Sequence, residues 1–424
     1  MSARGHTAYS VAEKLLHTAT NLLVFAAIAR ALGADGFGRL GLVQAIFFVG
    51  LPLATITGDQ VLIRFLVGGR HVPGTVLAQA LALKLGLSAA VYAASVAGAA
   101  LAFGREVATW VAIYALIHLV NVDLIFTSWF RAKEAGRTIF GLRNAVTVPF
   151  AAIKIATAFL TEDVALIAWA FVAEAVAHAS VFALAARRRR IAVGPAGTSA
   201  ELRELLGSAA PIAFATLLIV LYARIDQLMI GSMLDDAALG HYTAAVKVGE
   251  ASTYVLTSYM LARFPALLRE RAASEADYRR RIVLTIRQSV GFAALAFALA
   301  LPLSGPALSL AFGPDFDPAR GPLLIYLAGT AFIYSGILST QWLVAEGLER
   351  FRILRVSLGL AANVVLNALW IPRYGIEGAA WASLVAQLLS GFALNALHPR
   401  THPFFRLQCL ALVPRRLTDA ELLR

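Results

Sequence analysis

Four basic side chains lie deep inside long apolar segments of this 424-residue chain, where a charged group is costly. They are Lys84, Lys154, Arg224 and Lys247. A basic residue near the centre of a bilayer costs about 2.5–3.5 kcal/mol on insertion scales, so it normally faces a bundle interior or a wet cavity. Together the four predict a cationic pathway suited to an anionic headgroup, and they are our candidate substrate-binding residues.

Two acidic residues accompany this basic set. Asp226 follows Arg224 by two positions, and Glu250 follows Lys247 by three. We take Asp226 and Glu250 as candidates for ion coupling or gating. A simpler interpretation of Lys247 with Glu250, and of Glu174 with His178, is an internal pair on one helix face whose members neutralise each other. Both interpretations stay open at this point.

Further polar residues recur at helical spacing in both halves of the chain. One stripe is Thr243, Lys247, Glu250, Tyr254 and Ser258, at steps of three or four residues that place them on one helix face. The segment around Lys154 also carries Asn144 and Thr147. Such stripes predict a shared central cavity. For Asn363 and Asn367 we favour hydrogen bonds between helices over a role as ligands.

The composition excludes a soluble globular protein and predicts the elements that must position these residues. Hydrophobic residues make up 59% of the chain and charged residues 15%, against about 25% charged in soluble proteins. Hydropathy and turn residues predict about twelve membrane-spanning helices, each of about 20 residues or more. The expected spans are 9–32, 37–58, 74–103, 107–130, 138–160, 164–186, 207–233, 238–262, 284–312, 322–345, 351–371 and 377–398.

The net charge of +12 is explained by the distribution of basic residues among the connections between spans. One alternating set of connections is short and carries few basic residues, among them Arg105 and Arg373, whereas the other set holds runs such as Arg187–Arg190 and Arg279–Arg281. The positive-inside rule therefore places both termini in the cytoplasm of a multi-pass protein of the cell (inner) membrane. We expect no nucleic-acid partner; attraction of anionic lipid headgroups to the Arg187–Arg190 run is the alternative explanation.

A weak internal repeat predicts two lobes of six helices. Residues 32–40 recur as residues 234–242, with Leu32 matching Leu234 and Gly38 matching Gly240. We expect an N-terminal lobe over 1–190, a cytoplasmic linker over 191–206, a C-terminal lobe over 207–400 and a cytoplasmic tail over 401–424, with the lobes as parallel repeats.

The motifs of the common enzyme classes are missing from the sequence. There is no phosphate-binding loop, no dinucleotide fingerprint, no His-Glu-x-x-His and no Gly-x-Ser-x-Gly. Cys409 is the single cysteine, which excludes an intramolecular disulfide and a thiolate-ligated zinc or iron–sulfur site. We therefore expect no enzyme, no metal site and no cofactor, and an intramembrane polysaccharide polymerase or ligase is disfavoured because no large outward loop is predicted.

Three stretches resemble one protein family. Residues 224–231, with Arg224 and Asp226, and residues 239–245 look like the region around helices 7 and 8 of bacterial polysaccharide-biosynthesis flippases. Residues 363–380 resemble that family's asparagine-bearing helix, short outward turn and small-residue helix start, and residues 30–38 resemble its first outward turn. The family is the oligosaccharide-lipid (Wzx-type) flippase branch of the multidrug/oligosaccharidyl-lipid/polysaccharide exporter superfamily.

The resemblance implies an all-α polytopic bundle, MATE-like and V-shaped, that moves polyprenyl-diphosphate-linked oligosaccharide, such as O-antigen units, to the outer leaflet. It also implies alternating access coupled to a proton or sodium gradient, and contacts with membrane lipid and other polysaccharide-assembly membrane proteins. Asp226 matches the family's usual aspartate, whereas Arg224 and the lysines match it only in their charge. The alternatives are a multidrug or organic-cation antiporter on the same fold and a non-transporting partner of a glycan-synthesis complex.

Overall fold

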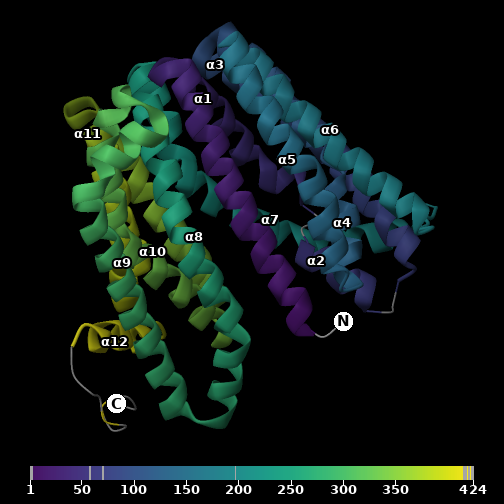
Figure 1. The fold of residues 1–424 in the computed structure, drawn as a ribbon. Helices are drawn as coiled ribbons and strands as arrows, with labels where there is room; N and C mark the ends of the chain where they lie inside the picture. The colour runs from purple at the N-terminus through teal and green to yellow at the C-terminus, as the bar shows by residue number, and fades with distance from the viewer. Residues whose placement is uncertain are drawn as a thin grey trace. The chain divides into compact units, whose positions relative to one another are not determined.

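The computed structural model describes residues 3–56, 59–68, 71–195, 197–413, 418 and 421, and its regular elements within these ranges are all helices (Figure 1). In order they are α1 (Ala3–Ala54), α2 (Asp59–Val67), α3 (Pro73–Val120), α4 (Asp123–Ala132), α5 (Gly136–Thr161), α6 (Val164–Arg188), α7 (Ser199–Met233), α8 (Asp236–Ala273), α9 (Glu275–Phe312), η1 (Pro314–Ala319), α10 (Arg320–Ala345), α11 (Glu349–Gly391), η2 (Ala393–Ala396) and α12 (His402–Ala411).

Three of the long helices are each divided by a single glycine. Gly33 in α1, Gly104 in α3 and Gly375 in α11 have φ angles of 67°, 87° and 58°, which L side chains rarely adopt. All three lie within the short outward turns that the sequence predicts. Each divided helix therefore supplies two spans, and with the undivided helices these account for the predicted number, so the all-α polytopic fold is confirmed.

The surface of these helices suits lipid. Eight segments of the described chain are long and apolar enough to cross a membrane, and they include α5, α6, α7 and α9 as single helices. Large apolar side chains point outward along them, with Leu101, Leu160 and Leu310 at least 79% exposed. Exposed apolar side chains on helices of this length are typical of a multi-pass membrane protein.

The chain packs as two units, Met1–Ser232 and Met233–Arg424. In the first unit α1 packs against α3 and α5, and α6 packs against α3 and α5. The beginning of α7 belongs to this unit because Leu205, Ala209 and Ala213 lie in one apolar cluster with residues of α2 and α3. In the second unit α10 is central, since it packs against α8, α9 and α11. The lobe boundaries drawn from the sequence stay a prediction.

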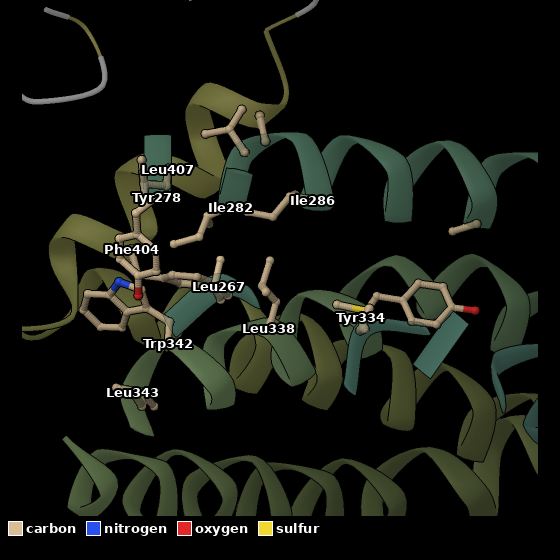
Figure 2. Close-up of a cluster of buried hydrophobic side chains, with 14 residues drawn as sticks. Leu267, Tyr278, Ile282, Ile286, Tyr334, Leu338, Trp342, Leu343, Phe404 and Leu407 are labelled. Atoms are coloured by element: carbon tan, nitrogen blue, oxygen red, sulfur yellow. The ribbon is translucent and has the colours of Figure 1, made fainter. Parts of the chain in front are cut away.

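The segment after the last span contains a docked helix, which the sequence analysis describes only as a tail. Phe404 and Leu407 of α12 are buried against Trp342 of α10 and Tyr278 of α9 (Figure 2). The Arg287 side chain donates to the carbonyls of Leu410 and Ala411 at 3.3 and 3.2 Å and so caps the end of α12. This helix therefore ties α9 to α10 within the second unit.

The glycine breaks give a first prediction. Replacing Gly104 by Ala should lower the free energy of unfolding by about 1–3 kcal/mol, because a side chain at φ 87° and ψ 179° strains the backbone. Nothing lies within 4 Å of the added methyl group, so the loss is a backbone effect. Gly98→Ala is the matched control: Gly98 also has open space but a helical φ, and its replacement should stabilise by about 0.5–1 kcal/mol. Unfolding of the two purified variants in detergent measures both stability changes. Equal changes would contradict the attribution of the Gly104→Ala loss to its backbone angles.

Candidate functional site

Lys84 lies at a break in the helix that the sequence predicts as one span over 107–130. α3 ends at Val120 and α4 begins at Asp123, and between them the Val122 N–H donates to the Val120 carbonyl at 2.7 Å. In a continuous helix that N–H would donate to the His118 carbonyl. Here the Lys84 ammonium donates to the His118 carbonyl instead, at 2.9 Å. The predicted span over 107–130 is thus interrupted at residues 121–122, where a side chain from another part of α3 replaces the backbone donor, while the segment Pro73–Ala132 as a whole is apolar enough to cross a membrane.

Lys154 lies in a buried ion pair. Its ammonium is 2.7 Å from Glu174 Oε2 of α6 and lies over the Phe171 ring, 4.4 Å from the ring centroid. His178 Nε2 lies 3.9 Å from the other carboxylate oxygen of Glu174 and 3.3 Å from Thr147 Oγ1. Glu174 and His178 are thus neighbours on α6, but the stronger partner of Glu174 is a lysine of α5.

Arg224 and Asp226 lie on α7 and differ in exposure. The Arg224 guanidinium is partly exposed, stacks over the Phe48 ring of α1 at 5.1 Å and donates to Gln227 Oε1 at 3.4 Å. Asp226 is buried, and its Oδ1 accepts the Gln227 N–H at 3.0 Å. The two side chains therefore share Gln227 as a neighbour, and Arg224 is the more accessible of the two.

Lys247 and Glu250 lie on α8, in the second unit, and both are partly exposed. Thr243, one turn before Lys247, is buried. The side chains of Tyr254 and Ser258, which complete the predicted stripe, lie outside the described residues.

The structure encloses two of the four predicted basic residues and leaves the other two partly exposed. Lys84 and Lys154 are 2% and 1% exposed inside the first unit, and each ammonium is occupied by a protein group. Arg224 and Lys247 keep part of their surface exposed. Asn367 donates to Asn363 at 2.7 Å, one turn away on the same helical segment. Asn363 donates to Ser383 at 3.1 Å, across the break at Gly375, and this bond alone of the two joins two predicted spans, as the favoured interpretation expects.

The sequence analysis missed two buried polar clusters. The first cluster lies at the break between α3 and α4 and consists of His118, Asp123 and Thr127. Two polar residues so close together within an apolar segment, Asn121 and Asp123, could have indicated this break. Arg355 lies near the start of α11, and its guanidinium donates to Thr340 Oγ1 at 2.9 Å and to the Gly336 carbonyl at 3.2 Å. Its position near the start of the predicted span 351–371, beside Arg350 and Arg352, gives no sign that it is buried.

A family model of polysaccharide biosynthesis proteins matches residues 5–270. The chain belongs to the polysaccharide biosynthesis protein family. All six candidate residues, from Lys84 to Glu250, lie inside the matched range.

The comparisons with individual proteins agree with this family. The capsular polysaccharide biosynthesis protein CapF of Staphylococcus aureus is 23% identical over 194 residues, which are 45% of this chain. The matched stretch spans about half of CapF, 48% of its length. Polysaccharide biosynthesis is therefore the setting that family and relative share.

Solved structures agree on the fold. The lipid II flippase MurJ in an inward closed conformation has a TM-score of 0.75 at 11% identity, covering 98% of this chain and 94% of that one. An inward-facing multidrug transporter of the MATE family has a TM-score of 0.73 at 14% identity, covering 95% and 96%. This member of the polysaccharide biosynthesis family therefore has the MATE-like transporter fold.

Proposed function

We propose that this protein is a flippase that moves polyprenyl-diphosphate-linked oligosaccharide from the cytoplasmic to the outer leaflet for export of cell-surface polysaccharide. The observation that carries the proposal is the family match to residues 5–270 together with the transporter fold over nearly the whole chain. The surplus of basic over acidic groups among the six candidate residues supports an anionic rather than a cationic cargo.

The cationic residues would screen the diphosphate. Arg224 is the best placed in this structure, because it is partly exposed and its planar guanidinium suits bidentate contacts to phosphate. Lys247 on α8 is the second accessible candidate. For Lys84 and Lys154 the substrate role stays a prediction, since reaching a ligand requires them to leave the His118 carbonyl and the Glu174 carboxylate.

Transport would be driven by an ion gradient. Binding of a cation or proton at Asp226 or Glu250 would favour one of the two access states, because a ligand shifts such an equilibrium only by its differential affinity. The protein would work in the inner membrane with both termini in the cytoplasm, alongside other polysaccharide-assembly membrane proteins.

Arg224 provides the test. Replacing Arg224 by Gln should weaken transfer of a fluorescent polyprenyl-diphosphate oligosaccharide in proteoliposomes by about 10- to 100-fold, because a hydrogen bond to a charged group contributes about 1.5–3 kcal/mol. The assay follows protection of the glycan from an external glycan-cleaving enzyme, with and without an imposed proton or sodium gradient.

Lys133→Gln is the matched control, since Lys133 is an exposed basic residue just after α4 and should tolerate the change. Equal transfer by Arg224→Gln and wild type would exclude Arg224 from the pathway. No transfer by wild type, even with glycolipid from the native host, would overturn the proposed function in favour of the drug antiporter or the non-transporting partner.

A further inference from the structure

The break between α3 and α4 gathers buried polar atoms that lack hydrogen-bond partners. Among the described residues, both ring nitrogens of His118, Asp123 Oδ1 and Thr127 Oγ1 have none. All three residues are at most 4% exposed. A buried polar atom without a partner costs about 1–3 kcal/mol, so such a concentration within ten residues of chain indicates a functional site.

A single ammonium group joins the helices at this break. Lys84 Nζ donates to the His118 carbonyl at 2.9 Å and lies 3.4 Å from Ser88 Oγ. Ser88 Oγ in turn donates to the carbonyl of Ala54, the last residue of α1, at 3.4 Å. The ammonium therefore contacts the carbonyl end of α3 directly, where the helix dipole favours a positive charge, and is linked to the end of α1 only through Ser88.

A carboxyl group lies on the other side of the break. Asp123 is the first residue of α4, where the helix dipole favours a negative charge. Of the charged or titratable groups that act on it, Arg143 of α5 has the largest effect, His178 of α6 follows, and Lys84 of α3 has the smallest. His118 of α3 is a further titratable neighbour of Lys84, and the Lys154–Glu174 pair lies beyond His178.

We propose that Asp123 and Lys84 form a buried proton-binding site at the α3–α4 break. Its protonation controls whether the start of α4 stays held against the C-terminal end of α3; we call the held state the closed break. When Asp123 is ionised, its charge holds the Lys84 ammonium against the His118 carbonyl. When a proton from water forms an O–H bond on the Asp123 carboxylate, that attraction is lost and α4 is released from the end of α3. The inference deepens the proposed function and rests on it, because it names the group that carries the coupling proton.

The site suits a proton better than a metal ion. A bound cation would have to share the space with the Lys84 ammonium, which already occupies the carbonyl end of α3. A proton on Asp123 adds no volume and supplies a donor within a cluster rich in acceptors without partners. The site is separate from Asp226 and Glu250 in sequence and in the helices that carry it.

Proton occupancy can be tested without substrate by infrared difference spectroscopy of the purified protein in lipid as the pH is lowered. We expect a band from a protonated carboxyl group that Asp123→Asn removes and that Asp226→Asn and Glu250→Gln leave in place. If Asp123→Asn fails to insert, Asp123→Glu should shift the band in frequency. A wild-type protein without such a band, or a band that persists in Asp123→Asn, overturns the site.

The closure of the break can be tested by hydrogen exchange of residues 118–127, corrected for intrinsic exchange rates. Lys84→Met should raise exchange in this segment, whereas the control Lys133→Met, at the exposed end of α4, should not. In wild type the exchange should rise as the pH falls, and Asp123→Asn should abolish this dependence. Exchange that is independent of both Lys84 and pH overturns the coupling between proton and break.

These outcomes are distinct from the failure of the proposed function. The protein could show the Asp123 band and pH-dependent hydrogen exchange at the break but move no oligosaccharide lipid. That result would overturn the proposed flippase function and leave the proton site in place. A protein that moves the lipid but lacks the band would overturn only the site. If both stand, transfer by Asp123→Asn should lose its stimulation by a proton gradient while exchange down a lipid gradient continues.

Discussion

Replacing Glu174 by Gln should lower the free energy of unfolding by about 3–5 kcal/mol, because it leaves the Lys154 ammonium buried without its counter-charge. The Lys154 side chain is 2% exposed and lies 2.7 Å from the Glu174 carboxylate, so water cannot replace the lost partner. His178, 3.9 Å from the other oxygen of Glu174, also loses a neighbour. Unfolding in mixed micelles measures the effect.

The double variant Lys154→Met/Glu174→Met separates the charge from the packing. It should recover most of the lost stability, since apolar side chains of similar volume often replace a buried pair without loss. Arg280→Met is a control, because Arg280 and Asp277 form an exposed pair one helical turn apart that should contribute less than about 1 kcal/mol. If the double variant is no more stable than Glu174→Gln, lost packing and not the unpaired charge accounts for the fall in the free energy of unfolding.

Replacing Arg355 by Met should lower the free energy of unfolding by about 3 kcal/mol, at the upper end of the range for buried acceptors that lose their donor. The Arg355 guanidinium donates to Ser339 and Thr340 of α10 and to Asn395 of η2, so it links three elements of the second unit. Arg355→Lys should recover only part of the loss, because an ammonium cannot reproduce the planar set of donors.

The Arg355 variant has a local readout besides stability. Asn395 Nδ2 donates to Gln408 of α12 at 3.1 Å, so disturbing Asn395 should loosen α12 and speed tryptic cleavage at Arg400 and Arg406. Arg350→Met is the matched control, since Arg350 lies one turn earlier on the same helix and is exposed. Equal cleavage of the Arg355→Met and Arg350→Met variants would contradict a structural role for Arg355.

The short turns between spans were predictable because their causes are local. Glycines at 33, 104 and 375 permit backbone angles that other residues avoid, and each lies in a predicted turn. Asp163 and Asp235 cap α6 and α8, accepting backbone N–H groups at 2.6 and 2.8 Å, which is likewise an interaction between residues close in sequence. The family too was accessible from the sequence, because its motifs are short continuous stretches.

The partners of the buried charges were not predictable in this way. Spacing offers Glu174 a neighbour on its own helix, His178, but packing of α5 on α6 gives it Lys154 as the closer partner. Arg355 lies near the start of the predicted span 351–371 beside the basic residues Arg350 and Arg352, and only the packing of α10 on α11 buries it.

By itself the sequence determined the membrane setting, the helices, their glycine breaks and the family, since hydropathy, turn geometry and short motifs act over a few neighbouring residues. Only the tertiary structure decided which basic groups are enclosed and which stay accessible. Lys84 and His118 are 34 residues apart in sequence, and Lys154 and Glu174 are 20 apart. Side chains so far apart in sequence meet only where helices pack, and that packing places the Lys84 ammonium on the His118 carbonyl and the Lys154 ammonium on the Glu174 carboxylate.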